Sequence, residues 1–114
     1  MKDRNPKLYL TDILDSIKQI EEYLSGFTLE MFEEDLEKQD SVMRRLEIIG
    51  EAAKQLQDDF KKLHSEVPWR DIADFRNVLI HEYSGIKRER VWEVVERDLP
   101  ILKTQICSFL KEVL

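Results

Sequence analysis

The sequence has few residues that interrupt helices and little that could cross-link the chain. Among its 114 residues are three glycines, three prolines and a single cysteine, Cys107. Gly and Pro together make up roughly 12% of an average protein, so their scarcity disfavours a sandwich or barrel of many short strands. One cysteine excludes an internal disulfide framework and a cysteine-rich zinc site.

Long apolar runs are also absent. The sequence has no stretch of 18 consecutive apolar residues, which is about the length that a membrane-spanning helix needs. The opening residues, MKDRNPKLYLTDILDS, lack the apolar centre of a signal peptide. We therefore expect a cytoplasmic protein, and the single cysteine agrees with that location.

The sequence has fewer basic than acidic side chains. The chain carries 18 basic and 24 acidic side chains, a formal net charge of −6. Residues 1–60 hold 15 of the acidic and eight of the basic ones, so residues 61–114 are nearly neutral. Because an acidic protein gains little from counterion release, an architectural DNA-binding protein is excluded. The nearly neutral second half leaves room for a local site that binds a phosphate.

Apolar residues follow a helical spacing nearly throughout the chain. They make up 42% of the residues, enough for one core in a single domain over residues 1–114. Asn5-Pro6 predicts the start of a first helix, which Gly26 ends. Thr28 predicts the cap of a short acidic helix, whose apolar residues are Leu29, Phe32 and Leu36.

Two longer helices follow along the chain. Asp40-Ser41 predicts the start of one whose apolar stripe, at steps of three and four residues, reaches Phe60. Pro68 marks the clearest break, because the residue before a proline avoids the helical conformation. The next helix is predicted to span about Trp69 to Glu82.

The last predicted helix begins near Arg88 and continues to the end of the chain, with Pro100 either kinking it or starting a new helix. Four to five helices with short connections predict an all-α, up-and-down bundle. Residues 42–60 and 91–113 are apolar on more than one side, and a small bundle often buries such surplus against a second copy. We therefore expect a homodimer.

One predicted helix carries residues that suit phosphate chemistry, namely Arg76, Asn77, His81 and Tyr83. At about 100° per residue, Asn77 and His81 share a face, whereas Arg76 and His81 lie about 140° apart. An arginine can clamp a phosphate, and a histidine can exchange a proton near neutral pH. Together they suffice for metal-free cleavage of RNA, in which the 2′-hydroxyl attacks its own phosphate. No cluster with metal-ligand spacing stands out.

Each of these residues also has an ordinary structural interpretation. A histidine such as His81, near the C-terminal end of a helix, is favoured by the helix dipole alone. Arg76 could simply pair with one of the nearby carboxylates, and Tyr83 could be a core residue. The other histidine, His64, is expected to be an ordinary solvated loop residue.

The spacing Arg-x4-His-x-Tyr, here Arg76 to Tyr83, resembles the signature of the HEPN superfamily, and more closely that of the HepT-like toxins. Three other segments resemble the family in the expected order. Residues 44–53 resemble its long central helix, residues 67–72 its lead-in to the motif helix, and residues 91–100 its last helix. The resemblance therefore covers nearly the whole chain.

The resemblance implies an all-α homodimer that acts, without a cofactor, as the metal-independent endoribonuclease of a toxin–antitoxin pair. It implies that Arg76 and His81 line a cleft between two protomers, with Asn77 in the same set. The implied antitoxin is a minimal nucleotidyltransferase that transfers AMP from ATP to the motif tyrosine, Tyr83. Adenylate there would add bulk and negative charge and so exclude RNA.

Four basic residues flank the motif and are candidates for contacts to RNA phosphates: Arg70, Lys87, Arg88 and Arg90. Their simpler interpretation is a solvated charged surface. Gly50 costs about 1 kcal/mol relative to Ala inside a helix, which indicates a close helix–helix approach. A role near the cleft is open to its neighbour Glu51, but spacing gives no argument for it. Trp69 and Trp92 are expected to be packing residues.

Two other functions fit the same residues. The protein could be a non-catalytic subunit that binds a nucleotide or a substrate for a nucleotidyltransferase. It could also be a purely structural helical dimer. Tight nucleotide binding by an inert protein would favour the first. In the second case, changing Arg76 or His81 would alter only stability.

Overall fold

All regular structure is helical, and no strand occurs, in the part of the chain that the structure describes. The structure is a computed structural model, and it describes residues 5–81 and 87–113. The helices are α1 (Pro6–Tyr23), α2 (Leu29–Glu34), α3 (Leu36–Gln55), α4 (Asp58–Leu63), α5 (Trp69–His81), α6 (Arg88–Glu93), the π-helical turn η2 (Val94–Asp98) and α7 (Leu99–Val113). The predicted all-α fold is confirmed.

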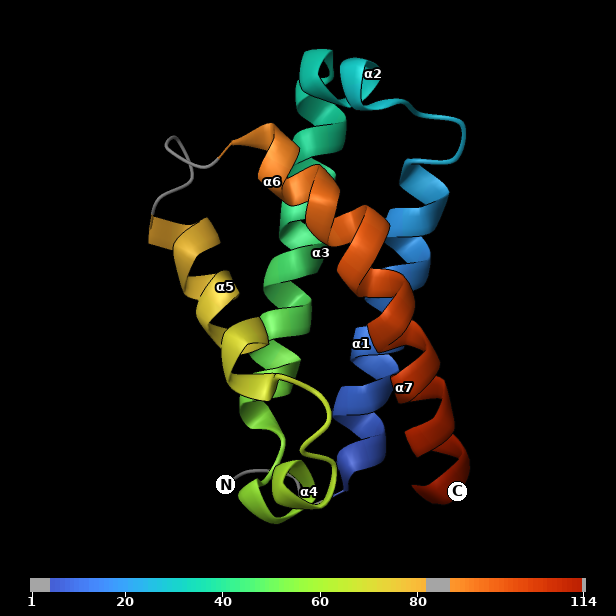
Figure 1. The fold of residues 1–114 in the computed structure, drawn as a ribbon, viewed down its shortest axis with the longest axis vertical. Helices are drawn as coiled ribbons and strands as arrows, with labels where there is room; N and C mark the ends of the chain where they lie inside the picture. Colours follow the sequence, from blue (N-terminus) through green and yellow to red (C-terminus); the bar gives the residue numbers. More distant parts are fainter. Residues whose placement is uncertain (1–4, 82–86, 114) are drawn as a thin grey trace.

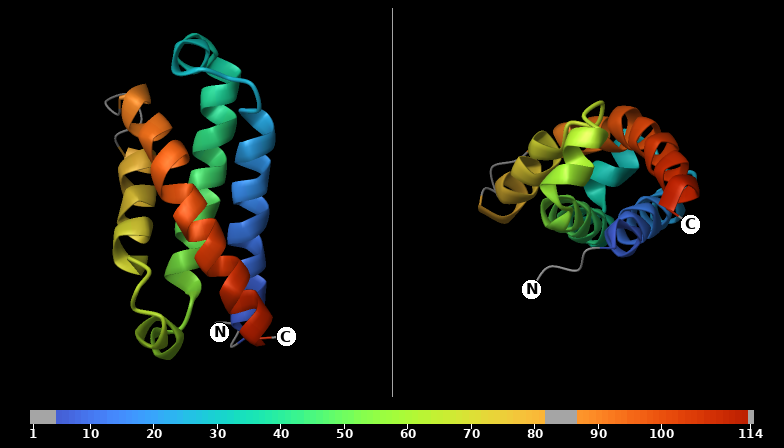
Figure 2. Two further views of the ribbon diagram at one scale, coloured as in Figure 1. Left: turned by 45° about the vertical axis from the view of Figure 1, so that its right-hand side comes forward. Right: turned by 90° about the horizontal axis from the view of Figure 1, so that it is seen from below.

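Four long helices run alternately up and down the molecule: α1, α3, α5 and the continuous helix formed by α6, η2 and α7 (Figure 1). The short helices α2 and α4 lie at opposite ends of the bundle. Seen along the bundle, α5 lies beside α3, α3 beside α1, and α1 beside α7 (Figure 2). The predicted up-and-down topology is therefore confirmed.

The first two helices begin where their capping residues predict. The side-chain oxygen of Asn5 accepts a hydrogen bond from the backbone N–H of Lys7 at 3.0 Å. The hydroxyl of Thr28 accepts one from the N–H of Met31 at 3.2 Å. Gly26 follows the end of α1 with a φ of +78°, a conformation that glycine adopts without steric cost.

The predicted bounds of the third helix are wrong at both ends. α3 begins at Leu36 rather than at Asp40-Ser41, because the carboxylate of Asp35 accepts the N–H of Lys38 at 3.0 Å and caps it. It ends at Gln55, and Leu56 has an extended ψ of 142°. Phe60 therefore belongs to the separate helix α4, although the apolar spacing continues across the break.

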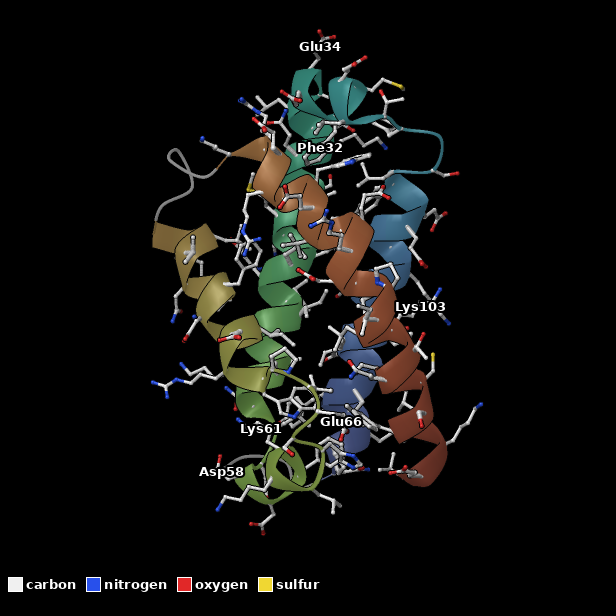
Figure 3. The ribbon with its side chains drawn as sticks, viewed as in Figure 1. Phe32, Glu34, Asp58, Lys61, Glu66 and Lys103 are labelled. Carbon is white, nitrogen blue, oxygen red and sulfur yellow. The ribbon has the colours of Figure 1, made fainter. Side chains whose placement is uncertain are left out.

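The core lies mainly among α1, α3 and α7. Its fully buried side chains include Leu10, Ile13, Ile17, Ile20, Val42, Ala53 and Ile106. Phe32 of α2 closes one end of the bundle (Figure 3), with its ring centroid 5.6 Å from that of Trp92. Helices α1 and α7 are also joined by an ion pair, in which Lys103 of α7 donates to the carboxylate of Glu21 of α1 at 2.8 Å.

His64 is buried, so the prediction that it is an ordinary solvated loop residue is wrong. Its ring lies 4.6 Å from that of Phe60 and 4.1 Å from that of Phe109, measured between centroids. Its two ring nitrogens lie 3.6 Å from the carboxylates of Glu66 and Glu112. An imidazole can pack its faces in a core while its nitrogens meet polar atoms at the edge, which explains the burial.

Pro100 lies inside a helix that runs without interruption from Arg88 to Val113. It directly follows the π-helical turn η2 as the second residue of α7, and it has no backbone N–H to donate to the preceding turn. The preceding turn is π-helical, and the N–H of Leu99 donates to the carbonyl of Val94. The helix thus changes its winding before the proline instead of breaking.

Candidate functional site

Helix α5, which carries the predicted motif, is anchored at its start and along its inner face. The indole N–H of Trp69 donates to the carbonyl of His64 at 3.0 Å, and the N–H of Ile72 donates to the carbonyl of Pro68 at 3.1 Å. Leu79 is fully buried. These contacts hold α5 alongside α3, as Figure 1 shows. Trp69 is thereby confirmed as a packing residue.

Helices α3 and α5 approach each other closely at Gly50. A Cβ atom added to Gly50 would clash with the Cβ of Arg76 and would lie 3.1 Å from its Cγ. The carbonyl oxygen of Ile72 would be 3.2 Å away. The predicted close helix–helix approach is confirmed, and it is Arg76 that fills the space.

The guanidinium of Arg76 is bound on two sides. One terminal nitrogen, Nη2, lies 3.3 Å from Oε2 of Glu51 on α3. The other, Nη1, donates to Oδ1 of Asn77 at 3.3 Å. Gln55 donates from Nε2 to the second oxygen of Glu51 at 3.1 Å. The side chain of Arg76 is 28% exposed, so it is held between the helices but remains in contact with solvent.

A hollow of about 200 Å³ lies beside this arginine. Helices α1, α3 and α5 all contribute to its lining, which includes Tyr9, Asp12, Arg44, Gln55, Arg76 and Ile80. Arg44 pairs within α3 with Glu47 at 3.3 Å. The hollow therefore combines an aromatic ring, carboxylates and the guanidinium of Arg76 at one surface.

The remaining motif residues are placed only in part. Asn77 is exposed, and His81 is the last residue of α5, one turn further along. The side chain of His81 and the whole of Tyr83 lie outside the described residues. The backbone of α5 thus brings Arg76, Asn77 and His81 onto one helix, as predicted.

The four basic residues predicted to contact RNA do not gather at one place. Arg70 is the second residue of α5, whereas Lys87 caps α6, which starts beyond the other end of α5. Arg88 donates from Nε to Oε1 of the buried Gln39 at 3.0 Å. The guanidinium carbon of Arg90 lies 6.0 Å from the ring centroid of Phe75 on α5. All four are exposed.

A second hollow, of about 590 Å³, lies on the other flank of α5. Its lining is mostly apolar and comes mainly from α3, α5, α6, η2 and α7, with Asp71, Asp74, Asp98 and Arg90 among the charged residues. Of the predicted catalytic residues whose side chains the structure describes, Arg76 and Asn77, neither borders it.

Two absences concern the described residues alone. Over residues 5–81 and 87–113, no three His, Cys, Asp or Glu side chains are grouped as metal ligands would be. No helix in these segments combines the length and apolar character needed to cross a membrane.

Two polar residues have tertiary roles for which the sequence pattern gave no argument. Glu51 contacts Arg76, and its only sequence signal is that it follows Gly50. Gln39 is 3% exposed and joins α2, α3 and α6 through its amide. No sequence pattern predicts that a glutamine will be buried in this way.

Comparison with known families gives a match over most of the chain. The family described as "Ribonuclease HepT-like" matches residues 13–109. A protein named "Probable ribonuclease HepT" from Thermococcus cleftensis is 46% identical over 100 residues, which are 88% of this chain and 91% of that relative. A protein named "Putative RNase" from Caldanaerobacter subterraneus is 38% identical over 109 residues, 96% of this chain and 97% of the relative.

A third relative is longer than this chain. It is named "Gamma-glutamylcyclotransferase and putative RNase", comes from Methanocaldococcus jannaschii, and is 41% identical over 110 residues. The match covers 96% of this chain but 50% of that relative, so the chain spans half its length. No solved structure matches the chain.

Proposed function

The chain belongs to the HepT-like ribonuclease family, and we propose that it is a metal-independent endoribonuclease whose Arg76 and His81 cleave RNA. The span that matches the family, residues 13–109, contains the whole motif. The single observation that carries the proposal is the setting of Arg76. Its side chain is partly exposed beside a hollow, on the same helix as Asn77 and His81.

The chemistry needs a group that moves protons and a group that stabilises negative charge. In the proposed reaction His81 removes the proton of the RNA 2′-hydroxyl, whose oxygen attacks the adjacent phosphorus and expels the 5′-oxygen of the next nucleotide. Arg76 donates hydrogen bonds to the phosphate oxygens, on which charge accumulates in the transition state. Asn77, which already contacts Arg76, is proposed to help orient these groups.

The leaving 5′-oxygen must receive a proton, and when both proton transfers occur in one step the base and the acid have to be different groups. A second copy of the motif across a dimer axis would supply a second His81. We therefore include a homodimer in the proposal, with the active cleft between two protomers. Light scattering coupled to gel filtration tests this directly, since the expected mass is that of two chains.

Regulation is proposed to act on Tyr83, two residues after His81 in the sequence. A minimal nucleotidyltransferase antitoxin would transfer AMP from ATP to its hydroxyl, releasing pyrophosphate. The adenylate would bring bulk and a negative phosphate close to the motif, and RNA would be excluded by steric overlap and like-charge repulsion.

Cleavage of diverse RNAs by the purified chain in the presence of EDTA tests the proposed activity. The parent is expected to cut, and Arg76→Ala and His81→Ala are each expected to lose at least about 100-fold in rate. Arg97→Ala, an exposed arginine of η2, is the matched control and should cut like the parent. If the parent leaves all RNAs intact in EDTA, the proposed activity is wrong.

The acidic charge of the chain favours one other candidate. With a net charge of −6 and carboxylates around the hollow, the protein is poorly suited to a long polyanion. It could instead be a non-catalytic subunit that binds a nucleotide or substrate for a nucleotidyltransferase. Isothermal titration with ATP separates the two, because tight binding by a protein that leaves RNA uncut supports this alternative.

A further inference from the structure

We propose that Glu51 is a positioning residue, which holds the guanidinium of Arg76 in the orientation that a phosphate requires. The inference rests on the proposed ribonuclease function, because it concerns how that reaction's arginine is held. It assigns Glu51 a role on a helix other than the one that carries the motif. Its evidence is the set of contacts around Arg76 and the approach of α3 to α5.

Two contacts hold the terminal nitrogens of the Arg76 guanidinium from opposite helices, α3 and α5. Glu51 occupies one terminal nitrogen of Arg76 at 3.3 Å, and Asn77 accepts from the other at 3.3 Å. An arginine has five N–H donors in a rigid planar fork. These two contacts act on the two terminal nitrogens and not on Nε, so they restrict rotation of the planar fork and leave N–H donors, that of Nε among them, that neither contact uses.

Glu51 is itself held, which is what makes it suited to orient another group. Its second oxygen accepts a hydrogen bond from Gln55, one turn along α3, at 3.1 Å. Both carboxylate oxygens therefore have a partner. The chain of contacts runs from Gln55 through Glu51 and Arg76 to Asn77, linking α3 to α5.

The helix approach brings this carboxylate within reach. At Gly50 the backbone of α3 lies against Cβ and Cγ of Arg76, so the start of the arginine side chain is fixed by packing. The far end has further rotatable bonds, and its ordering has an entropic cost. A carboxylate on the residue next to Gly50 supplies the second point of fixation.

The same carboxylate carries a negative charge close to where a phosphate would bind. Glu51 is 47% exposed, so solvent screens this charge without removing it. Removing Glu51 should have two opposite effects. The lost orientation should lower kcat, because it acts on the transition state, whereas the lost negative charge should leave KM for RNA unchanged or lower it. A merely structural residue would not produce this split.

Three variants separate orientation from charge. Glu51→Ala removes both, whereas Glu51→Gln removes the charge but keeps an oxygen that can accept from Arg76. Glu47→Ala is the matched control, because Glu47 lines the same hollow one turn earlier but pairs with Arg44. We expect kcat to fall roughly tenfold in Glu51→Ala and to stay within about threefold of the parent in the other two.

A second measurement does not depend on activity. The Nε–H signal of Arg76 in a ¹⁵N NMR spectrum can be assigned by its loss in Arg76→Lys. Its heteronuclear NOE should show a rigid group in the parent, in Glu51→Gln and in Glu47→Ala, and a mobile one in Glu51→Ala. An inert parent protein with a rigid Arg76 would contradict the ribonuclease proposal while supporting the positioning role.

The inference is overturned by either of two results. One is an Arg76 Nε–H group that is as mobile in the parent as in Glu51→Ala. The other is an active parent in which Glu51→Ala and Glu47→Ala have the same kcat. Unfolding temperatures close to that of the parent in all three variants would show that altered folding does not explain the kinetics.

Discussion

Gly50 of α3 and Arg76 of α5 are in direct contact, backbone against side chain. No side chain larger than hydrogen fits at residue 50 while Arg76 keeps its place, because an added Cβ would clash with the Cβ of Arg76. The clash lies at the start of the arginine side chain, so rotation of its flexible end cannot relieve it. One glycine thus sets both the spacing of two helices and the position of the proposed phosphate clamp.

Gly50→Ala is therefore expected to destabilise the protein, although alanine is the better helix former by about 1 kcal/mol. Forcing an extra methyl group into such a contact costs about 1–3 kcal/mol beyond that gain, and α5 must move outward. Urea unfolding measures the change in free energy. Lys54→Ala, at an exposed position one turn later on α3, should change stability by less than about 0.5 kcal/mol. A Gly50→Ala protein more stable than the parent would show that α5 yields easily.

Gln39→Leu is expected to lower the free energy of unfolding by about 2 kcal/mol. The amide of Gln39 donates to the carbonyls of Phe32 and Glu33 at 2.9 and 3.1 Å and accepts from Arg88 at 3.0 Å. Leucine fills a similar volume but removes all three hydrogen bonds at a position that is 3% exposed. Ser41→Ala is the control, because its hydroxyl bonds only to Glu37 within α3. Equal losses in the two variants would contradict a special role for Gln39.

RNA binding should depend weakly on salt. With only a few dispersed basic residues, two to four phosphate contacts would give a slope of log affinity against log salt of about −1.4 to −2.8. Fluorescence anisotropy with a single-stranded RNA and the His81→Ala protein measures it without cleavage. Lys87→Ala should make the slope shallower by about 0.7, and Arg97→Ala should not change it. A slope steeper than about −5 would contradict binding through a small local site.

The Tyr83→Phe protein should keep its RNA cleavage activity in the presence of a nucleotidyltransferase and ATP. Incubation of the parent with such an enzyme and ATP is expected to add AMP and to abolish RNA cleavage, because the adenylate blocks the motif. Intact-protein mass spectrometry detects the added group. Tyr23→Phe, altered at a tyrosine of α1, should be modified like the parent. Modification of Tyr83→Phe would place the acceptor elsewhere.

Helix starts were predictable where a short polar side chain marks them. Asn5-Pro6 and Thr28 each predict a cap, and each accepts the expected backbone N–H. The cap at Asp35 escaped notice because Leu36 follows Phe32 at a helical spacing and was therefore assigned to the preceding short helix. In the structure Leu36 is 64% exposed and is the first residue of α3.

The break between α3 and α4 was hidden for a different reason. Apolar residues continue at helical intervals through Leu56 to Phe60 although the backbone leaves the helix after Gln55. Phe60 packs against Trp69 and Phe109, at ring-centroid distances of 6.1 and 6.0 Å. Its spacing along the chain therefore reflects a tertiary cluster, which a single helical wheel cannot represent.

The site was predictable only along one helix. Arg76, Asn77 and His81 follow from spacing within α5, since helical geometry relates residues a few positions apart. The pairing of Arg76 with Glu51 depends on where α5 crosses α3, 25 positions earlier in the chain. Gly50 indicated that two helices meet there, but not which side chain fills the space.

The π-helical turn η2 has a consequence for how the length of this protein can vary. Buried positions of α7 advance by three or four residues, but the step across η2, from Val94 to Leu99, is five. A π-helical turn accommodates that step because it holds about one residue more than an α-helical turn. Deletion of one exposed residue, Glu96 or Arg97, would shorten the step between these two buried positions from five residues to four. An ordinary α-helix makes a step of four. The loss of one residue here is thus absorbed by the winding of the helix, and the same side chains remain in the core.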